Sequence, residues 1–101
     1  MPKGYVIFTE DVRDAAGMGE YGRAAAPTIR DHGGRTIVYA PGAQAVEGNW
    51  HGTQTVVVEF DSVEAAQAWY SSPEYTAARA MRAAAADSNA VIVPGFELPA
   101  S

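Results

Sequence analysis

The order of the predicted elements indicates an α+β protein with the ferredoxin-like βαββαβ fold and a four-stranded antiparallel sheet. Two observations lead to this fold class. Short segments rich in β-branched and aromatic residues alternate with longer segments whose apolar residues recur at helical spacing. Ser72-Pro73 then interrupts the second helical segment. Because serine before proline is typical of a new helix start, we expect the second helix to be broken in two.

The first half of the chain supplies two strands and one helix. Residues 5–9 are β-branched or aromatic and predict the first strand. Apolar residues recur every three or four positions from Asp14 to His32, which predicts a helix that ends at Gly33-Gly34. Residues 36–40 predict the second strand, and Pro41-Gly42 ends it.

The second half repeats the pattern after a loop rich in glycine and polar residues. The third strand is predicted over residues 53–60. Asp61 followed by Glu64 is a capping pattern, which starts a helix over residues 63–71. The second helical piece is predicted over residues 73–86, and residues 90–93 predict the last strand.

The size and charge of the chain restrict what it can be. A length of 101 residues predicts one domain, over residues 1–101. A net charge of −5, with seven lysines and arginines, argues against binding to nucleic acid or to anionic membranes, because both need a basic surface. The absence of cysteine excludes disulfides, thiolate metal sites and cysteine nucleophiles. The apolar stretch near the start is too short for a signal peptide core or a membrane span, so we expect a cytoplasmic protein.

Both faces of the predicted sheet are largely apolar. Alternate residues of a strand point to opposite faces, so the third strand places Val56 and Val58 on one face and Val57 on the other. The last strand separates Val91 from Ile92 in the same way. Two helices can cover only one face, and an exposed apolar sheet favours aggregation. We therefore predict a homodimer in which the uncovered faces pack against each other.

The motifs, taken in order, match a known family. They are Gly4-Tyr5, Gly33-Gly34-Arg35, Glu47-Gly48-Asn49-Trp50, Glu59-Phe60, Trp69-Tyr70-Ser71-Ser72-Pro73-Glu74-Tyr75 and Arg82. With these motifs the chain resembles the bacterial domain of unknown function 1330 family over nearly its whole length. The resemblance implies a ferredoxin-like subunit of the dimeric α/β-barrel group and no established activity. Wider relatives in that group include cofactor-free monooxygenases, lactone isomerases and haem-degrading enzymes, so the fold alone does not select a function.

Glu59 is the candidate catalytic residue. It lies between Val58 and Phe60, and its side chain points to the face opposite theirs. A carboxylate on a largely apolar face must find a partner or shift its pKa upward, and acids with shifted pKa values gather at functional sites. The alternative is a structural ion pair with Arg35, Arg79 or Arg82, or an edge position that faces water.

Four residues near the helix break are candidate ligand contacts. Trp69 and Tyr75 flank the break, where clefts form, whereas we expect Tyr70 in the core. Arg79 and Arg82 lie three positions apart and share a helix face, so they could hold a carboxylate or phosphate group. The alternative for the two arginines is a solvated face or an ion pair between subunits.

The loop before the third strand carries Glu47, Trp50 and His51 beside two glycines. These residues could form the lip of a pocket, since binding residues often lie on loops. Alternatively, the loop is a hairpin excursion whose tryptophan packs on the dimer partner. We predict no metal site, because the only histidines, His32 and His51, lie on separate elements.

Together these residues support a hypothesis of function and two alternatives. In the first, a small anionic or aromatic metabolite binds between helices and sheet, with Glu59 as acid/base and Arg82 as anchor. No cofactor is needed, because the residues suit proton transfer of the isomerase or lyase type. The first alternative is a non-catalytic dimeric binding or structural module. The second alternative, suggested by the wider relatives, is a cofactor-free monooxygenase-like enzyme.

Overall fold

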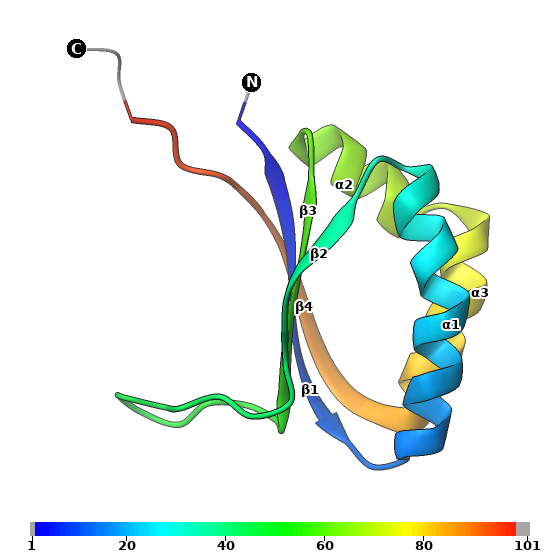
Figure 1. Ribbon diagram of the computed structural model, residues 1–101, viewed down its shortest axis with the longest axis vertical. Helices are drawn as coiled ribbons and strands as arrows, with labels where there is room; N and C mark the ends of the chain where they lie inside the picture. The colour runs from blue at the N-terminus through cyan, green and yellow to red at the C-terminus, as the bar shows by residue number, and fades with distance from the viewer. Residues whose placement is uncertain (1, 99–101) are drawn as a thin grey trace.

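Two layers make up the structure, which is a computed structural model that describes residues 2–98. Its elements are β1 (Gly4–Val12), α1 (Ala15–Asp31), β2 (Arg35–Ala40), β3 (Gln54–Phe60), α2 (Val63–Tyr70), α3 (Pro73–Ala85) and β4 (Ala86–Pro94). The strands form one antiparallel sheet in the order β2-β3-β1-β4. The three helices lie on one side of this sheet (Figure 1). The predicted ferredoxin-like fold, with its second helix in two pieces, is confirmed.

The core lies between the sheet and the helices. On β1, Val6 and Phe8 point toward the helices and are almost fully buried, and Val58 and Phe60 of β3 join them. We call this face of the sheet the inner face. Trp69 of α2 lies over it and is fully buried.

Trp69 connects three parts of the fold. Its ring packs against the rings of Phe8, Phe60 and Tyr75, with centroid distances of 6.4, 5.3 and 3.9 Å. Its indole N–H donates a hydrogen bond of 3.0 Å to the hydroxyl of Thr28 on α1. The side chain therefore joins α1, the helix break and the sheet, and its only polar group is satisfied.

Serine side chains cap the N-termini of α2 and α3. The Ser62 hydroxyl accepts from the backbone N–H of Ala65, so Ser62 is the cap of α2. Asp61, which the sequence pattern favoured as the cap, instead lies 3.5 Å from the ammonium group of Lys3. The Ser72 hydroxyl accepts from the N–H of Tyr75 and caps α3, as predicted.

Two strands are longer than the sequence predicts. β1 continues through Glu10 to Val12, and β4 begins at Ala86 rather than at residue 90. The extended ends pair with each other, Glu10 opposite Ser88 and Val12 opposite Ala86. Pairing across an antiparallel ladder outweighs the weak strand preference of residues such as aspartate and serine. In residues 2–98, no helix combines the length and apolar character that crossing a membrane requires.

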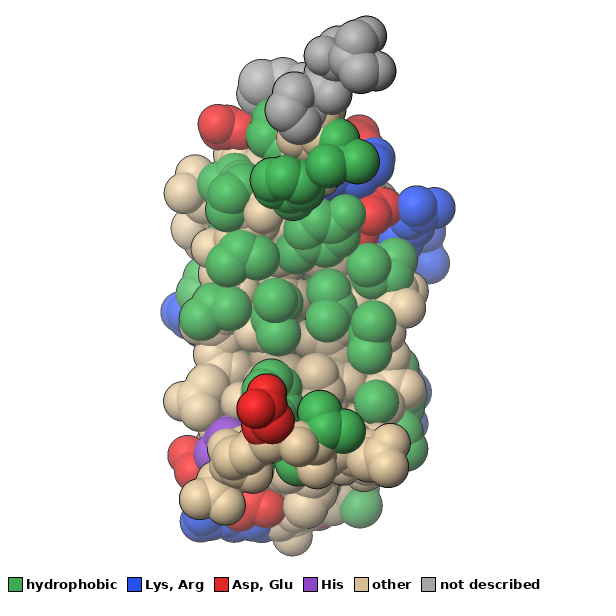
Figure 2. All heavy atoms as spheres, turned by 90° about the vertical axis from the view of Figure 1, so that its left-hand side faces the viewer, with side chains coloured by type: hydrophobic (Ala, Val, Ile, Leu, Met, Phe, Trp, Pro, Cys, Tyr) green, Lys and Arg blue, Asp and Glu red, His purple; other side chains and the backbone are tan. Residues whose placement is uncertain are grey.

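The opposite, outer face of the sheet carries no helix within the described residues. Its middle is covered by apolar side chains, which Figure 2 shows as a green field. Val91 of β4 is half exposed there, and it lies opposite Ile7 of β1. In Figure 1 the segment between β2 and β3 extends away from the sheet on this same side. The expectation that both faces are largely apolar is thus met.

Trp69→Ala should lower the free energy of unfolding by about 3–5 kcal/mol, because it removes a large buried aromatic side chain and leaves Thr28 without its donor. Ser72→Ala removes only a helix cap and should cost about 1 kcal/mol. Urea melts of the two variants measure the difference. A Trp69→Ala variant within about 1 kcal/mol of wild type would contradict the central packing role of the indole.

Candidate functional site

A cavity of about 720 Å³ lies between α1 and the inner face of the sheet. Small residues on the facing side of α1 leave this space: Gly19, Gly22, Ala25 and Ala26 all line it. Apolar side chains from the sheet and α2, such as Phe8, Val56 and Trp69, form much of the opposite wall. The cavity is therefore a mostly apolar enclosure with few polar groups.

Glu10 is the buried acid of this cavity. It is 2% exposed, lines the cavity from β1, and follows Val6 and Phe8 on the inner face. The amide nitrogen of Gln54, directly opposite on β3, donates a hydrogen bond of 2.8 Å to Oε1. No cation lies within ion-pair distance of this carboxylate in the described part of the chain.

Sequence analysis missed Glu10 because it placed the end of the first strand at residue 9. The signal was present, since extending the alternation of Val6 and Phe8 by one step brings Glu10 to the inner face. Gln54 was equally hidden, because its importance comes only from its place opposite Glu10 in the register.

Two tyrosines and an arginine lie beside the cavity. The hydroxyls of Tyr21 on α1 and Tyr75 on α3 are hydrogen-bonded at 2.8 Å. Burial, reinforced by the neighbouring Tyr75, raises the pKa of Tyr21 well above its ordinary value. Burial also raises the pKa of Tyr75, although Tyr21 and Arg82 act against this shift. Both phenols therefore keep their protons at neutral pH.

The four candidate residues near the helix break do not line a single pocket in the structure. Trp69 lines the cavity, whereas Tyr75 is fully buried behind the cavity residues Trp69 and Tyr21. Arg82 is 6% exposed, with its guanidinium 5.0 Å from the ring centre of Phe8. Together with Arg79, it lines a separate groove between α3 and β4.

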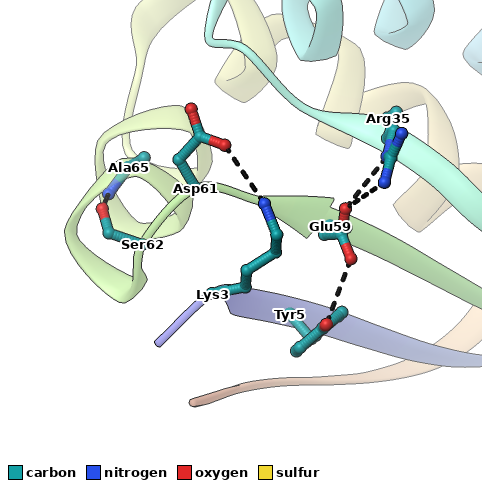
Figure 3. A network of polar contacts seen from close by, with 7 residues as sticks. All are labelled: Lys3, Tyr5, Arg35, Glu59, Asp61, Ser62 and Ala65. Carbon is teal, nitrogen blue, oxygen red and sulfur yellow. Dashed lines mark hydrogen bonds and ion pairs between the residues drawn. The ribbon is translucent and has the colours of Figure 1, made fainter. Parts of the chain in front are cut away.

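Glu59 does not share the cavity with these residues, so the predicted grouping needs correction. Its side chain points to the outer face, because Val58 and Phe60 on either side of it point inward. There it accepts hydrogen bonds from Arg35 at 2.9 Å and from the Tyr5 hydroxyl at 3.1 Å (Figure 3). Glu59 therefore forms an ion pair with Arg35, which was one of the alternatives predicted from the sequence.

The pKa of Glu59 follows from this network. Partial burial would raise the pKa, but the hydrogen bonds from Arg35 and Tyr5 outweigh it and hold the pKa below its ordinary value. The hydrogen bond to Glu59 in turn raises the pKa of Tyr5. At neutral pH the negative charge of Glu59 is therefore balanced by Arg35, and this arrangement suits a structural role.

The loop residues also lie away from the cavity. Trp50 is half exposed, and its indole N–H donates to the hydroxyl of Thr55 at 2.9 Å, while Glu47 is exposed. The ring of His51 lies 2.9 Å from the Thr9 hydroxyl, which anchors the loop to β1. No three metal-ligating side chains converge anywhere in residues 2–98.

Comparison with known proteins identifies a family and a fold. The sequence profile of the family described as Domain of unknown function (DUF1330) matches residues 3–96. No curated protein matches the chain.

Solved structures with this fold come from several bacteria. A protein of unknown function from Rhodopseudomonas palustris is 20% identical, with a TM-score of 0.79 over 96% of this chain and 85% of its own. SnoaB, a cofactor-independent oxygenase from Streptomyces nogalater, is 9% identical, with a TM-score of 0.70 over 97% of each chain. A dimeric ferredoxin-like protein of unknown function from Thermobifida fusca is 20% identical, with a TM-score of 0.60 over 92% of this chain and 91% of its own. At these identities the likeness shows the fold alone.

Glu59→Gln should destabilise the protein in a pH-dependent way. Because the pKa of Glu59 is lowered on folding, its contribution is fully present above the unfolded pKa of about 4.3 and is lost as pH falls through the folded value. The stability difference between wild type and variant should therefore be constant above about pH 5 and shrink below about pH 4. Urea melts across this range measure it. A difference that grows as the pH falls would contradict the ion pair, and Asp61→Asn, in an exposed pair, should show a smaller difference throughout.

Proposed function

The chain belongs to the family described as Domain of unknown function (DUF1330), and we propose that it binds a small aromatic or anionic metabolite in the cavity between α1 and the sheet. There it promotes a proton transfer of the isomerase or lyase type without a bound cofactor. Glu10 acts as the acid/base in place of Glu59. The observation that carries this proposal is a nearly fully buried carboxylate in a cavity whose wall is mainly apolar.

The size and lining of the cavity support a small-molecule ligand. Its volume of about 720 Å³ falls in the range of ordinary ligand pockets, which are apolar with a few placed polar groups. The partly buried Tyr21 and the exposed Tyr39 line the cavity and offer ring surfaces to a flat substrate, and the exposed Arg30 lines it from α1 and can attract an anionic one.

The polar groups supply what proton transfer needs. Gln54 fixes Oε1 of Glu10, while Oε2 has no hydrogen-bond partner in residues 2–98 and is free to accept a substrate proton. The neutral hydroxyl of Tyr21, also a cavity residue, can donate to the oxygen on which negative charge develops. A base and a neutral hydrogen-bond donor in one pocket are the minimum for enolisation.

A cofactor-free oxygenase is the second candidate. It is favoured by the shared fold of SnoaB, which is named as a cofactor-independent oxygenase. The first step would be the same, because an electron-rich substrate must lose a proton before it can react with dioxygen. The two candidates then differ in whether dioxygen is consumed.

The test is a thermal-shift screen of aromatic and carboxylic metabolites, followed by product analysis and an oxygen electrode on each hit. Glu10→Gln keeps the shape of the side chain and should lower turnover by about 10²–10⁴-fold while ligands still bind. Glu59→Gln, the matched control on the other face, should keep turnover. Equal turnover in wild type and Glu10→Gln would refute the role of Glu10. Hits that bind without any chemical change would support the non-catalytic binding module instead.

We also propose that the protein is a homodimer that joins through its outer sheet faces. The apolar field in Figure 2 is the surface that a second copy would cover. The neighbour from Thermobifida fusca is described as dimeric. The segment between β2 and β3 extends on the same side and carries Val46, which is 83% exposed, and Trp50 (Figure 1). Such a segment is placed to contact the partner.

Val91→Asp should separate the subunits, because it puts a charge in the middle of the proposed interface. Light scattering coupled to size exclusion should give twice the 10.6 kDa chain mass for wild type and a lower mass for the variant. Met81→Asp makes the same change at an exposed apolar residue of α3 and should leave the dimer intact. A monomeric wild type at micromolar concentration would refute the dimer.

A further inference from the structure

A second hollow, separate from the cavity, lies between α3 and β4. This groove has a volume of about 520 Å³ and is lined by two arginines, two hydroxyl residues, one tyrosine and three alanines. These are Arg79, Arg82, Thr76, Ser88, Tyr70, Ala80, Ala83 and Ala90. Within residues 2–98 no acidic side chain lines the groove, although the whole chain carries a net charge of −5. The groove is thus a local positive site on an acidic protein.

The junction between α3 and β4 brings the key groups together. α3 ends at Ala85 and β4 begins at Ala86, so no loop separates them. The backbone N–H of Ala86 still donates to the carbonyl of Arg82, which holds the last helical turn against the start of the strand. Ser88 points to the same side, because it lies opposite the inward-pointing Glu10. Arg82 and Ser88 therefore face one groove from two elements.

Both of these side chains hold buried polar atoms without a partner. Nε of Arg82 and Oγ of Ser88 are buried and make no hydrogen bond in the described part of the chain. Arg82, at 6% exposed, also makes no ion pair with residues 2–98. A buried charge is expensive unless it is paired, and buried polar groups normally find partners. The guanidinium has the rings of Phe8 and Tyr21 and the side chain of Tyr75 beside it. Burial would lower its pKa, but the tyrosines outweigh burial and raise the pKa, so the group stays charged while its Nε stays unpaired within residues 2–98.

Glu10 does not neutralise Arg82. Although Glu10 is opposite Ser88, its carboxylate is held by Gln54 from β3, on the side of β1 away from β4. The two charges are beyond ion-pair distance of each other. The positive charge of Arg82 is therefore available to a ligand that enters from the groove.

We propose that the groove between α3 and β4 binds a phosphate group of a small metabolite, held by the guanidinium groups of Arg82 and Arg79 and by the Ser88 hydroxyl. Two positive charges match a doubly charged phosphate, and guanidinium forks suit its oxygens. Arg79 is already oriented, since its guanidinium lies 4.8 Å from the ring centre of Tyr70. The groove is much larger than one phosphate, so the organic part of the metabolite lies along Tyr70 and the alanines. This site is separate from the cavity under α1, although Arg82 also lies beside Phe8 and Tyr21 of the cavity wall.

Calorimetric titration with three probes tests the proposal: inorganic phosphate, phenyl phosphate and benzoate, all at constant ionic strength. Wild type should bind both phosphates saturably, and phenyl phosphate more tightly, because its ring adds contact with the groove. Tighter binding of benzoate than of phenyl phosphate would overturn the assignment to phosphate. Absence of saturable binding up to about 10 mM phosphate would overturn the site itself.

Three variants locate the binding. Ser88→Ala and Arg79→Gln should each weaken phosphate binding by about tenfold or more, as expected for a hydrogen bond to a charged group. Arg23→Gln removes an exposed arginine of α1 that lines neither hollow, and it should bind as wild type does. This control matters because phosphate also stabilises proteins without binding to a site. Equal affinity in wild type and Ser88→Ala would place the phosphate outside the groove and refute the proposal.

Arg82→Lys completes the set, because it keeps the charge and loses the planar fork. It should bind phosphate more weakly than wild type, while circular dichroism shows the same fold. Should the variant unfold, Ser88→Ala and Arg79→Gln decide the matter, since Ser88 is a small side chain at a strand position and Arg79 is only half-buried.

Discussion

The alternation of side chains along β1 determines where the apolar and charged groups of this protein lie. β1 is a central strand, paired with β3 on one side and β4 on the other, so its two faces set the faces of both neighbours. Phe8 and Glu10 point to the helices, and Glu59, opposite Tyr5, must point away. A register shift of one residue would exchange all these positions. The alternation along β1 that builds the core therefore also places Glu10 and Glu59 on opposite faces of the sheet.

The surroundings of three charged side chains decide what each can do. Glu59 has a guanidinium and a phenol as donors, so its charge is compensated and it contributes to the sheet. Glu10 has only an amide donor, which leaves one oxygen unengaged inside a cavity. Arg82 has the ring faces of Phe8 and Tyr21 and the side chain of Tyr75 beside it. Burial would lower the pKa of Arg82, but the surrounding tyrosines outweigh it and raise the pKa, so the guanidinium stays charged. Its Nε has no hydrogen-bond partner in residues 2–98.

The fold could be predicted from the sequence because its signals are local. The change from a period of two to a period near four marks the elements, and Ser72 before Pro73 marks the helix break. The candidate site was harder, because it depends on pairing between distant segments. Glu10 belongs to the inner face because pairing with β3 and β4 extends β1 beyond residue 9. Glu59 was correctly assigned to the face opposite Val58 and Phe60, but it was also placed in a pocket between helices and sheet. Only the three-dimensional structure shows that the helices and the cavity lie on the other face.

The proposed dimer uses the outer face of the sheet and the two proposed binding sites use the inner face, and this separation has a thermodynamic consequence. The proposed assembly leaves α1, α3 and both hollows uncovered, so neither the cavity nor the groove competes with a partner subunit for surface. A ligand that binds the native subunit, and a second copy that binds it, each stabilise the fold by mass action. These contributions add when the sites do not touch. Ligand-induced stabilisation should therefore have the same size at every protein concentration, although the melting temperature itself depends on that concentration. A ligand effect that fades as the protein is concentrated would show instead that the ligand and the dimer contact are coupled through the sheet.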